Sequence, residues 1–102
     1  MAEEFRDDEK FVIMADVPGL DPETEISVAI TTGVLHIRAH QNSGDALPGS
    51  DLREGTFSRD IRLSPGADES SVSAIYVDGV LEVRVPMRER NGANRVIPVT
   101  RG

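Results

Sequence analysis

The sequence predicts an all-β protein, an antiparallel β-sandwich with an extended C-terminal tail. Apolar and polar residues alternate with a period of two along most of the chain, and almost no stretch shows the 3.6-residue period of a helix. Turn-forming Gly, Pro and Asp residues divide the alternation into about six or seven short segments. Strands with one apolar and one solvated face are typical of antiparallel sheets, which bury their apolar faces against each other.

Three strands are expected in the first half of the chain, over residues 11–17, 26–30 and 35–39. The first ends at Pro18-Gly19, and a turn at residues 21–23 precedes the second. Thr32-Gly33 joins the second to the third. This pair is typical of a tight hairpin turn, because glycine readily adopts the positive φ that the turn requires.

The second half begins with a segment that breaks the alternation. Residues 41–55 form a loop of about 15 residues, long for a compact domain, with Leu52 as the main candidate for burial. Alternation resumes over residues 57–63, 72–77 and 81–85. Asp78-Gly79 is a type I′ hairpin signal between the last two strands, and Pro86 ends the pattern. We expect a sandwich domain over residues 1–86 and a flexible extension over residues 87–102.

A weak internal repeat relates two of these hairpins. Gly33-Val34-Leu35-His36-Ile37-Arg38 resembles Gly79-Val80-Leu81-Glu82-Val83-Arg84, and each copy opens the return strand of a hairpin. No third copy exists, so the repeat does not indicate a solenoid. It predicts two similar hairpins that face each other across one core.

Composition excludes several classes of protein. The chain has 102 residues, the length of one domain, and a net charge of −7, which argues against a binder of nucleic-acid phosphates. It has no cysteine for disulfides, thiol catalysis or cysteine zinc sites. Its first ten residues lack an apolar signal-peptide region, and no apolar run approaches the length of roughly 18 residues that a membrane helix needs. We expect a cytoplasmic protein that binds neither nucleic acid nor membrane.

We expect no enzymatic activity, no metal and no cofactor. His36 and His40 share one face of a strand but lie roughly 13 Å apart, too far to hold one metal ion. The acidic runs Asp7-Asp8-Glu9 and Asp68-Glu69 fall at turns, where carboxylates cap backbone N–H groups. No positioned base and no nucleotide-binding loop is recognisable.

The two ends of the chain carry opposite charge. Residues 1–25 hold nine acidic residues against two basic ones, whereas residues 87–102 hold four arginines against Glu89. The ends could attract each other between chains, or both could simply be solvated. The C-terminal end also carries an apolar patch, in which Ile97 and Val99 face the same side of an extended chain stiffened by Pro98. Two such side chains suit an apolar groove at a sheet edge, on another chain or on the same one.

Five segments in order resemble the α-crystallin domain of small heat-shock proteins of the bacterial type, from about Phe5 to Val99. They are Ala15-Asp16-Val17-Pro18-Gly19-Leu20, Gly33-Val34-Leu35-His36-Ile37, Phe57-Ser58-Arg59-Asp60-Ile61-Arg62-Leu63-Ser64-Pro65, Asp78-Gly79-Val80-Leu81-Glu82-Val83 and Ile97-Pro98-Val99. The resemblance implies an immunoglobulin-like β-sandwich. Ser64 interrupts the family's Leu-Pro step. The family's long apolar N-terminal arm is replaced by about ten acidic, polar residues before the first clear strand, so we expect small assemblies rather than large closed shells.

The resemblance also implies roles for individual residues. The tail segment Ile97-Pro98-Val99 would dock in a groove of a neighbouring subunit. That groove would be lined by Ile26, Val28, Ile30, Val72 and Ala74. A dimer would form by exchange of a strand near Asp51, Leu52, Arg53 and Glu54, which would pair with the partner's edge near Glu4, Phe5 and Arg6. Arg59 would support the dimer through a salt bridge.

The function implied by the resemblance is that of an ATP-independent holdase. Such a protein binds unfolding client proteins, prevents their aggregation and acts through homodimers and higher homo-oligomers. The alternative is a non-catalytic β-sandwich interaction or co-chaperone domain without holdase activity, which would not need the tail motif. An adhesion-type sandwich is a third possibility, against which the absence of cysteine and of a secretion signal weighs.

Overall fold

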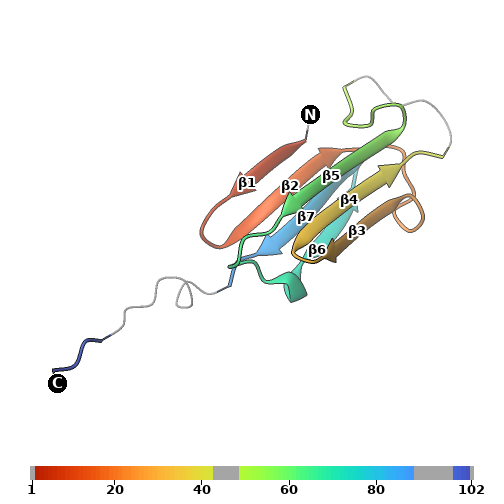
Figure 1. The fold of residues 1–102 in the computed structure, drawn as a ribbon. Coiled ribbons are helices and arrows are strands. Elements are labelled where there is room, and N and C mark those ends of the chain that lie inside the picture. Colours follow the sequence, from red (N-terminus) through yellow and green to blue (C-terminus); the bar gives the residue numbers. More distant parts are fainter. Residues whose placement is uncertain (1, 43–48, 89–97, 102) are drawn as a thin grey trace.

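The protein is a sandwich of two antiparallel β-sheets (Figure 1). The computed structural model describes residues 2–42, 49–88 and 98–101. The four-stranded sheet has the order β1 (Glu3–Arg6), β2 (Lys10–Asp16), β7 (Val80–Pro86) and β6 (Ser73–Val77). The three-stranded sheet has the order β3 (Ile26–Thr31), β4 (Val34–His40) and β5 (Thr56–Arg62). The prediction of an all-β sandwich is confirmed. Among the described residues, no helix is long and apolar enough to cross a membrane.

Both predicted hairpins form, one in each sheet. Thr32 and Gly33 join β3 to β4 with φ values of 50° and 76°, and Asp78 and Gly79 join β6 to β7 with φ values of 52° and 80°. Two successive positive φ values are the signature of a type I′ turn. The internal repeat therefore marks two equivalent hairpins on opposite sides of the core.

Two elements do not show in the alternation of the sequence. Strand β1 lies at the edge of its sheet and pairs with β2 from Glu3↔Met14 to Arg6↔Phe11. All four of its residues are exposed, so it lacks the alternation that marks a half-buried strand. The other element is the short 3₁₀ helix η1 (Glu69–Ser71), whose N-cap Asp68 accepts a hydrogen bond from the Ser70 amide. A single turn of helix is too short to show a helical period.

The alternating apolar residues meet between the sheets, as predicted. Phe11, Ile13 and Ala15 of β2 face Leu35, Ile37 and Ala39 of β4, and the strand β7 adds Leu81, Val83 and Val85. Leu52 is also buried in this cluster, at 5% exposure, so its predicted burial is confirmed.

The Tyr76 side chain links the β6–β7 hairpin to the turn that follows β2. The Tyr76 hydroxyl donates a hydrogen bond to the Val17 carbonyl at 2.8 Å and accepts one from the Leu20 amide at 3.1 Å. The Pro18-Gly19 turn is thereby held against the β6–β7 hairpin. A Cβ atom at Gly79 would lie only 3.1 Å from Pro18, so this hairpin requires glycine for space as well as for its positive φ.

Candidate interaction surfaces

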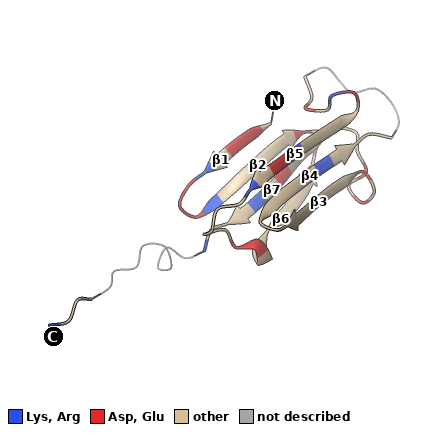
Figure 2. Cartoon of the chain, viewed as in Figure 1, with Lys and Arg blue, Asp and Glu red and all other residues tan. Residues whose placement is uncertain are grey.

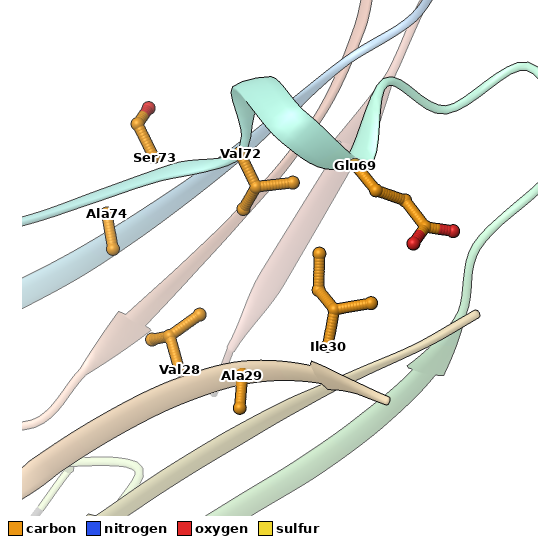
Figure 3. Close-up of a pocket in the computed structure, with 7 residues that line it drawn as sticks. All are labelled: Val28, Ala29, Ile30, Glu69, Val72, Ser73 and Ala74. Carbon is orange, nitrogen blue, oxygen red and sulfur yellow. The ribbon is translucent and has the colours of Figure 1, made fainter. Parts of the chain in front are cut away.

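An open apolar groove lies between β3 and β6, the edge strands on one side of the sandwich. Its volume is about 300 Å³, and Figure 3 shows the side chains that surround it. Val28 and Ile30 project from β3 towards Val72, which lies just before β6, and Ala74, which lies within it. The groove is also lined by Ala29, Glu69 and Ser73.

Four of the five residues predicted to form a groove are brought together here. Ile26 instead lines a second hollow of about 230 Å³, together with Thr24, Glu25, Ser27, Arg38, His40 and Asn42. Glu69 was not predicted to be part of the groove. Its place depends on η1, which turns the chain across the groove's end. The sequence predicts a turn at Asp68-Glu69, but not which surface that turn would lie against.

The predicted tail motif is only partly described. Ile97 lies outside the described residues, whereas Pro98 and Val99 are exposed, Val99 at 96%. The Val99 side chain is therefore not part of the core of its own domain.

On the opposite side of the sandwich, an ion pair connects the other two edge strands. Arg59 of β5 and Glu4 of β1 approach to 2.6 Å between Nη1 and Oε2. The Arg59 guanidinium also lies 5.7 Å from the centre of the Phe57 ring. The predicted dimer residues Arg59 and Glu4 thus meet within a single chain, at an edge where β1 leaves one side of its backbone unpaired by any described strand.

The predicted exchange segment contacts its own domain at Asp51 and at Arg53, which forms an antiparallel bridge with Thr56 of β5. The Asp51 amide donates to the Asp16 carbonyl at 2.7 Å, and the Asp16 amide donates to the Asp51 carboxylate at 2.6 Å. Leu52 is buried next to this contact, whereas Arg53 and Glu54 are exposed. Residues 43–48 of the predicted loop lie outside the described residues.

Apolar side chains are also exposed at both edges of the four-stranded sheet. Ile75 and Val77 of β6 are 56% and 58% exposed, and Phe5 of β1 is 50% exposed. Because neighbouring residues on a strand point to opposite faces, Ile75 and Val77 lie on the face of β6 opposite to Ala74. The edge strand β6 therefore presents apolar side chains both to the groove and to solvent.

The charged residues lie in turns and along the strands (Figure 2). The pKa of the Asp60 carboxyl is lowered by a hydrogen bond from His36 and then by one from Arg38. Hydrogen bonds from Ser70 and Ser71 lower the pKa of Asp68, and backbone amides lower the pKa of Asp7 and Glu25. These shifts favour the charged form, the opposite of what a general acid needs at neutral pH.

Both histidines lie on the solvated face of β4, as predicted from the alternation. His36 Nδ1 lies 2.7 Å from Asp60 Oδ1, and His40 Nδ1 lies 3.0 Å from Thr56 Oγ1. Within residues 2–42, 49–88 and 98–101, no group of three or more His, Asp or Glu side chains could hold a metal ion.

Comparison with known proteins places the chain in a family. The model of the Hsp20/alpha crystallin family matches residues 3–100, so the protein belongs to that family. It is 33% identical over 96 residues to an 18 kDa heat shock protein of Streptomyces albus, covering 89% of this chain and 66% of that one. It is 30% identical over 91 residues to an alpha-crystallin of Mycobacterium tuberculosis, covering 88% of this chain and 63% of that one. The chain thus spans slightly less than two thirds of the length of these relatives.

Solved structures show the same fold. A small heat-shock protein from Xylella fastidiosa superimposes with a TM-score of 0.73 at 25% identity, over 100% of this chain and 93% of that one. The hspA protein of Xanthomonas axonopodis superimposes with a TM-score of 0.68 at 32% identity, over 86% of this chain and 92% of that one. The predicted resemblance to the α-crystallin domain is confirmed.

Proposed function

We propose that the protein is an ATP-independent holdase that binds unfolding proteins in the cytoplasm and keeps them from aggregating. The observation that carries this proposal is the apolar groove between two edge strands. A sheet edge offers unpaired N–H and C=O groups to an extended segment, and apolar walls add side-chain contacts. Unfolding proteins expose such segments. Membership of a chaperone family supports the same conclusion.

Self-association would protect these edges when no client is present. We propose that the tail of one subunit places Ile97 and Val99 in the β3–β6 groove of another. The almost complete exposure of Val99 in the single chain leaves it available for this contact. The linker of residues 87–96 can span at most roughly 33–36 Å when extended, which is long enough to reach a neighbour.

Dimerisation would use the opposite side of the sandwich. We propose that the segment Asp51–Glu54 extends towards the partner and pairs along the free side of β1, at Glu4, Phe5 and Arg6. The burial of Leu52 in its own domain would anchor one point of that segment while Arg53 and Glu54 remain exposed. Arg59 would stabilise β1 through its ion pair with Glu4.

The experiment is suppression of aggregation. A heat-labile client is warmed with increasing amounts of the protein, with and without ATP, and light scattering is recorded. We expect scattering to fall with protein concentration and to be unchanged by ATP. A chain that binds the client but leaves scattering at the level of an inert control protein would be an interaction domain rather than a holdase.

A further inference from the structure

The β3–β6 groove is chemically asymmetric along its length. Its walls are apolar apart from Ser73, but a carboxylate, that of Glu69, stands at one end (Figure 3). Ile30 and Val72 lie nearer to Glu69, and Val28 and Ala74 lie towards the opposite end of the groove. An extended occupant therefore meets a negative charge at one end of its apolar contact.

Glu69 is not needed to hold its own helix. The cap of η1 is Asp68, whose carboxylate receives hydrogen bonds from the Ser70 amide, the Ser70 hydroxyl and the Ser71 hydroxyl. Glu69 is exposed, and within the described part of the chain no hydrogen bond or ion pair engages its carboxylate. Its charge is therefore available to a ligand in the groove.

The tail of the chain carries a matching pattern. Arg95, Ile97, Val99 and Arg101 are spaced by two residues, so in an extended chain all four side chains point to the same side. Consecutive members of the row lie roughly 7 Å apart. Two apolar side chains are thus flanked by one arginine on each side, and the row fits a groove with an apolar floor and an acidic end.

We propose that the tail of a neighbouring subunit lies in the groove with its Arg101 next to Glu69, so that this ion pair favours the same direction as the packing of the apolar side chains. This inference rests on the proposed docking of the tail. The sizes of the apolar side chains favour this direction, because close packing places the larger tail side chain opposite the pair of smaller groove residues. Ile97 is then opposite Val28 and Ala74, and Val99 is opposite Ile30 and Val72.

In this arrangement the tail runs parallel to β3, and Arg101 reaches the acidic end. The reverse direction would bring Arg95 to Glu69 instead and set the larger Ile97 against the bulkier pair Ile30 and Val72. Because an exposed ion pair contributes little affinity, its effect is on orientation more than on strength. Replacing Glu69 by lysine should weaken assembly only about two- to fivefold.

Disulfide trapping tests the direction directly, since the native chain has no cysteine. One sample of the full chain carries E69C and a second carries R101C, so only contact between subunits can join them. The two are mixed, allowed to exchange subunits and oxidised, and the covalent dimer is measured on a non-reducing gel. The matched control replaces the second chain by one carrying R95C.

We expect the E69C–R101C pair to give at least about fivefold more covalent heterodimer than the E69C–R95C pair, because a disulfide requires Cα atoms within about 7 Å. Equal yields, or a larger yield from R95C, would overturn the proposed direction.

A further variant separates this inference from the docking on which it depends. I97A and V99A are added to the chain that carries R101C. Loss of both the covalent product and the larger assemblies would support docking through the apolar residues. If these substitutions leave assembly size unchanged, docking itself is wrong, and the direction inference fails with it. If assembly depends on them but R101C gives no preferential product, only the direction inference is wrong.

Discussion

Filling the groove from its β6 wall should disrupt assembly without unfolding the domain. Ala74 is exposed and its side chain projects into the groove, so A74F places a ring where the tail would lie. Ile75 is the next residue, 56% exposed on the opposite face of the same strand. I75F is therefore a matched control, which adds a ring to β6 and leaves the groove open.

The magnitude follows from what the tail loses. Burying Ile97 and Val99 stabilises a docked tail by about 1.5–3 kcal/mol for each side chain. Ordering the tail costs about 1–2 kcal/mol for each residue that is fixed, so the net affinity of one tail is low. Assembly then depends on several tails acting together. Because a loss of about 1.4 kcal/mol per tail weakens its binding tenfold, A74F should shift the population strongly towards dimers.

Sedimentation velocity over a range of concentrations measures this shift, and circular dichroism measures the melting temperature. Surface substitutions change stability by about 0.5 kcal/mol or less, so both variants should melt within roughly 2–4 °C of the parent chain. The reasoning is refuted if A74F and I75F give the same size distribution as the parent. It is also refuted if the parent chain never exceeds a dimer.

Three further predictions concern the contacts that support these surfaces. Y76F should lower the free energy of unfolding by about 1–3 kcal/mol, because two buried backbone groups lose their partner; chemical denaturation measures the loss, and S73A on the same strand is the control. R59E should destabilise β1 by no more than about 1 kcal/mol, since the ion pair is partly exposed, and the swap E4R with R59E should restore the parent midpoint. D60N should reduce the stability lost between pH 7 and pH 3, which denaturation midpoints at the two pH values measure.

The sign of that pH effect follows from the lowered pKa of Asp60. Hydrogen bonds from His36 and Arg38 hold it below the ordinary value of 3.8. A carboxyl whose pKa is lower in the folded state contributes stability above its unfolded pKa, and this contribution is lost as the pH falls through the folded pKa. Acid sensitivity should therefore begin near pH 4 and continue below it. An unchanged acid sensitivity in D60N would show that the Asp60 contacts add nothing to stability.

The sequence determined the local structure of this protein. Alternation with a period of two puts the same side chains of a strand on its apolar face, whichever strand it pairs with. Phe11, Ile13, Leu35 and Val83 could therefore be assigned to the core from the sequence. Turn chemistry is equally local, because Gly33 and Gly79 supply a positive φ that other residues adopt only at a cost. The spacing of Ile97 and Val99 is likewise a property of the chain itself.

Tertiary structure decided which elements lie together. Strand β1 has no apolar face, and only its pairing with β2 makes it a strand, because β-propensity depends on neighbours. The ion pair between Glu4 and Arg59 joins residues 55 positions apart. Leu52 could be predicted as buried, but not that its anchor would be the backbone of Asp16.

In the groove, too, some features follow from the sequence and others only from the tertiary structure. Its apolar walls could be predicted only from the family resemblance, because alternation alone indicates no more than that Val28 and Ile30, or Val72 and Ala74, share one face of their own strand. The charge at its end could not, because it depends on where a single turn of helix places Glu69 relative to a strand in the opposite sheet. Local patterns set which way a side chain points from its own backbone, whereas the packing of two sheets sets what that side chain meets.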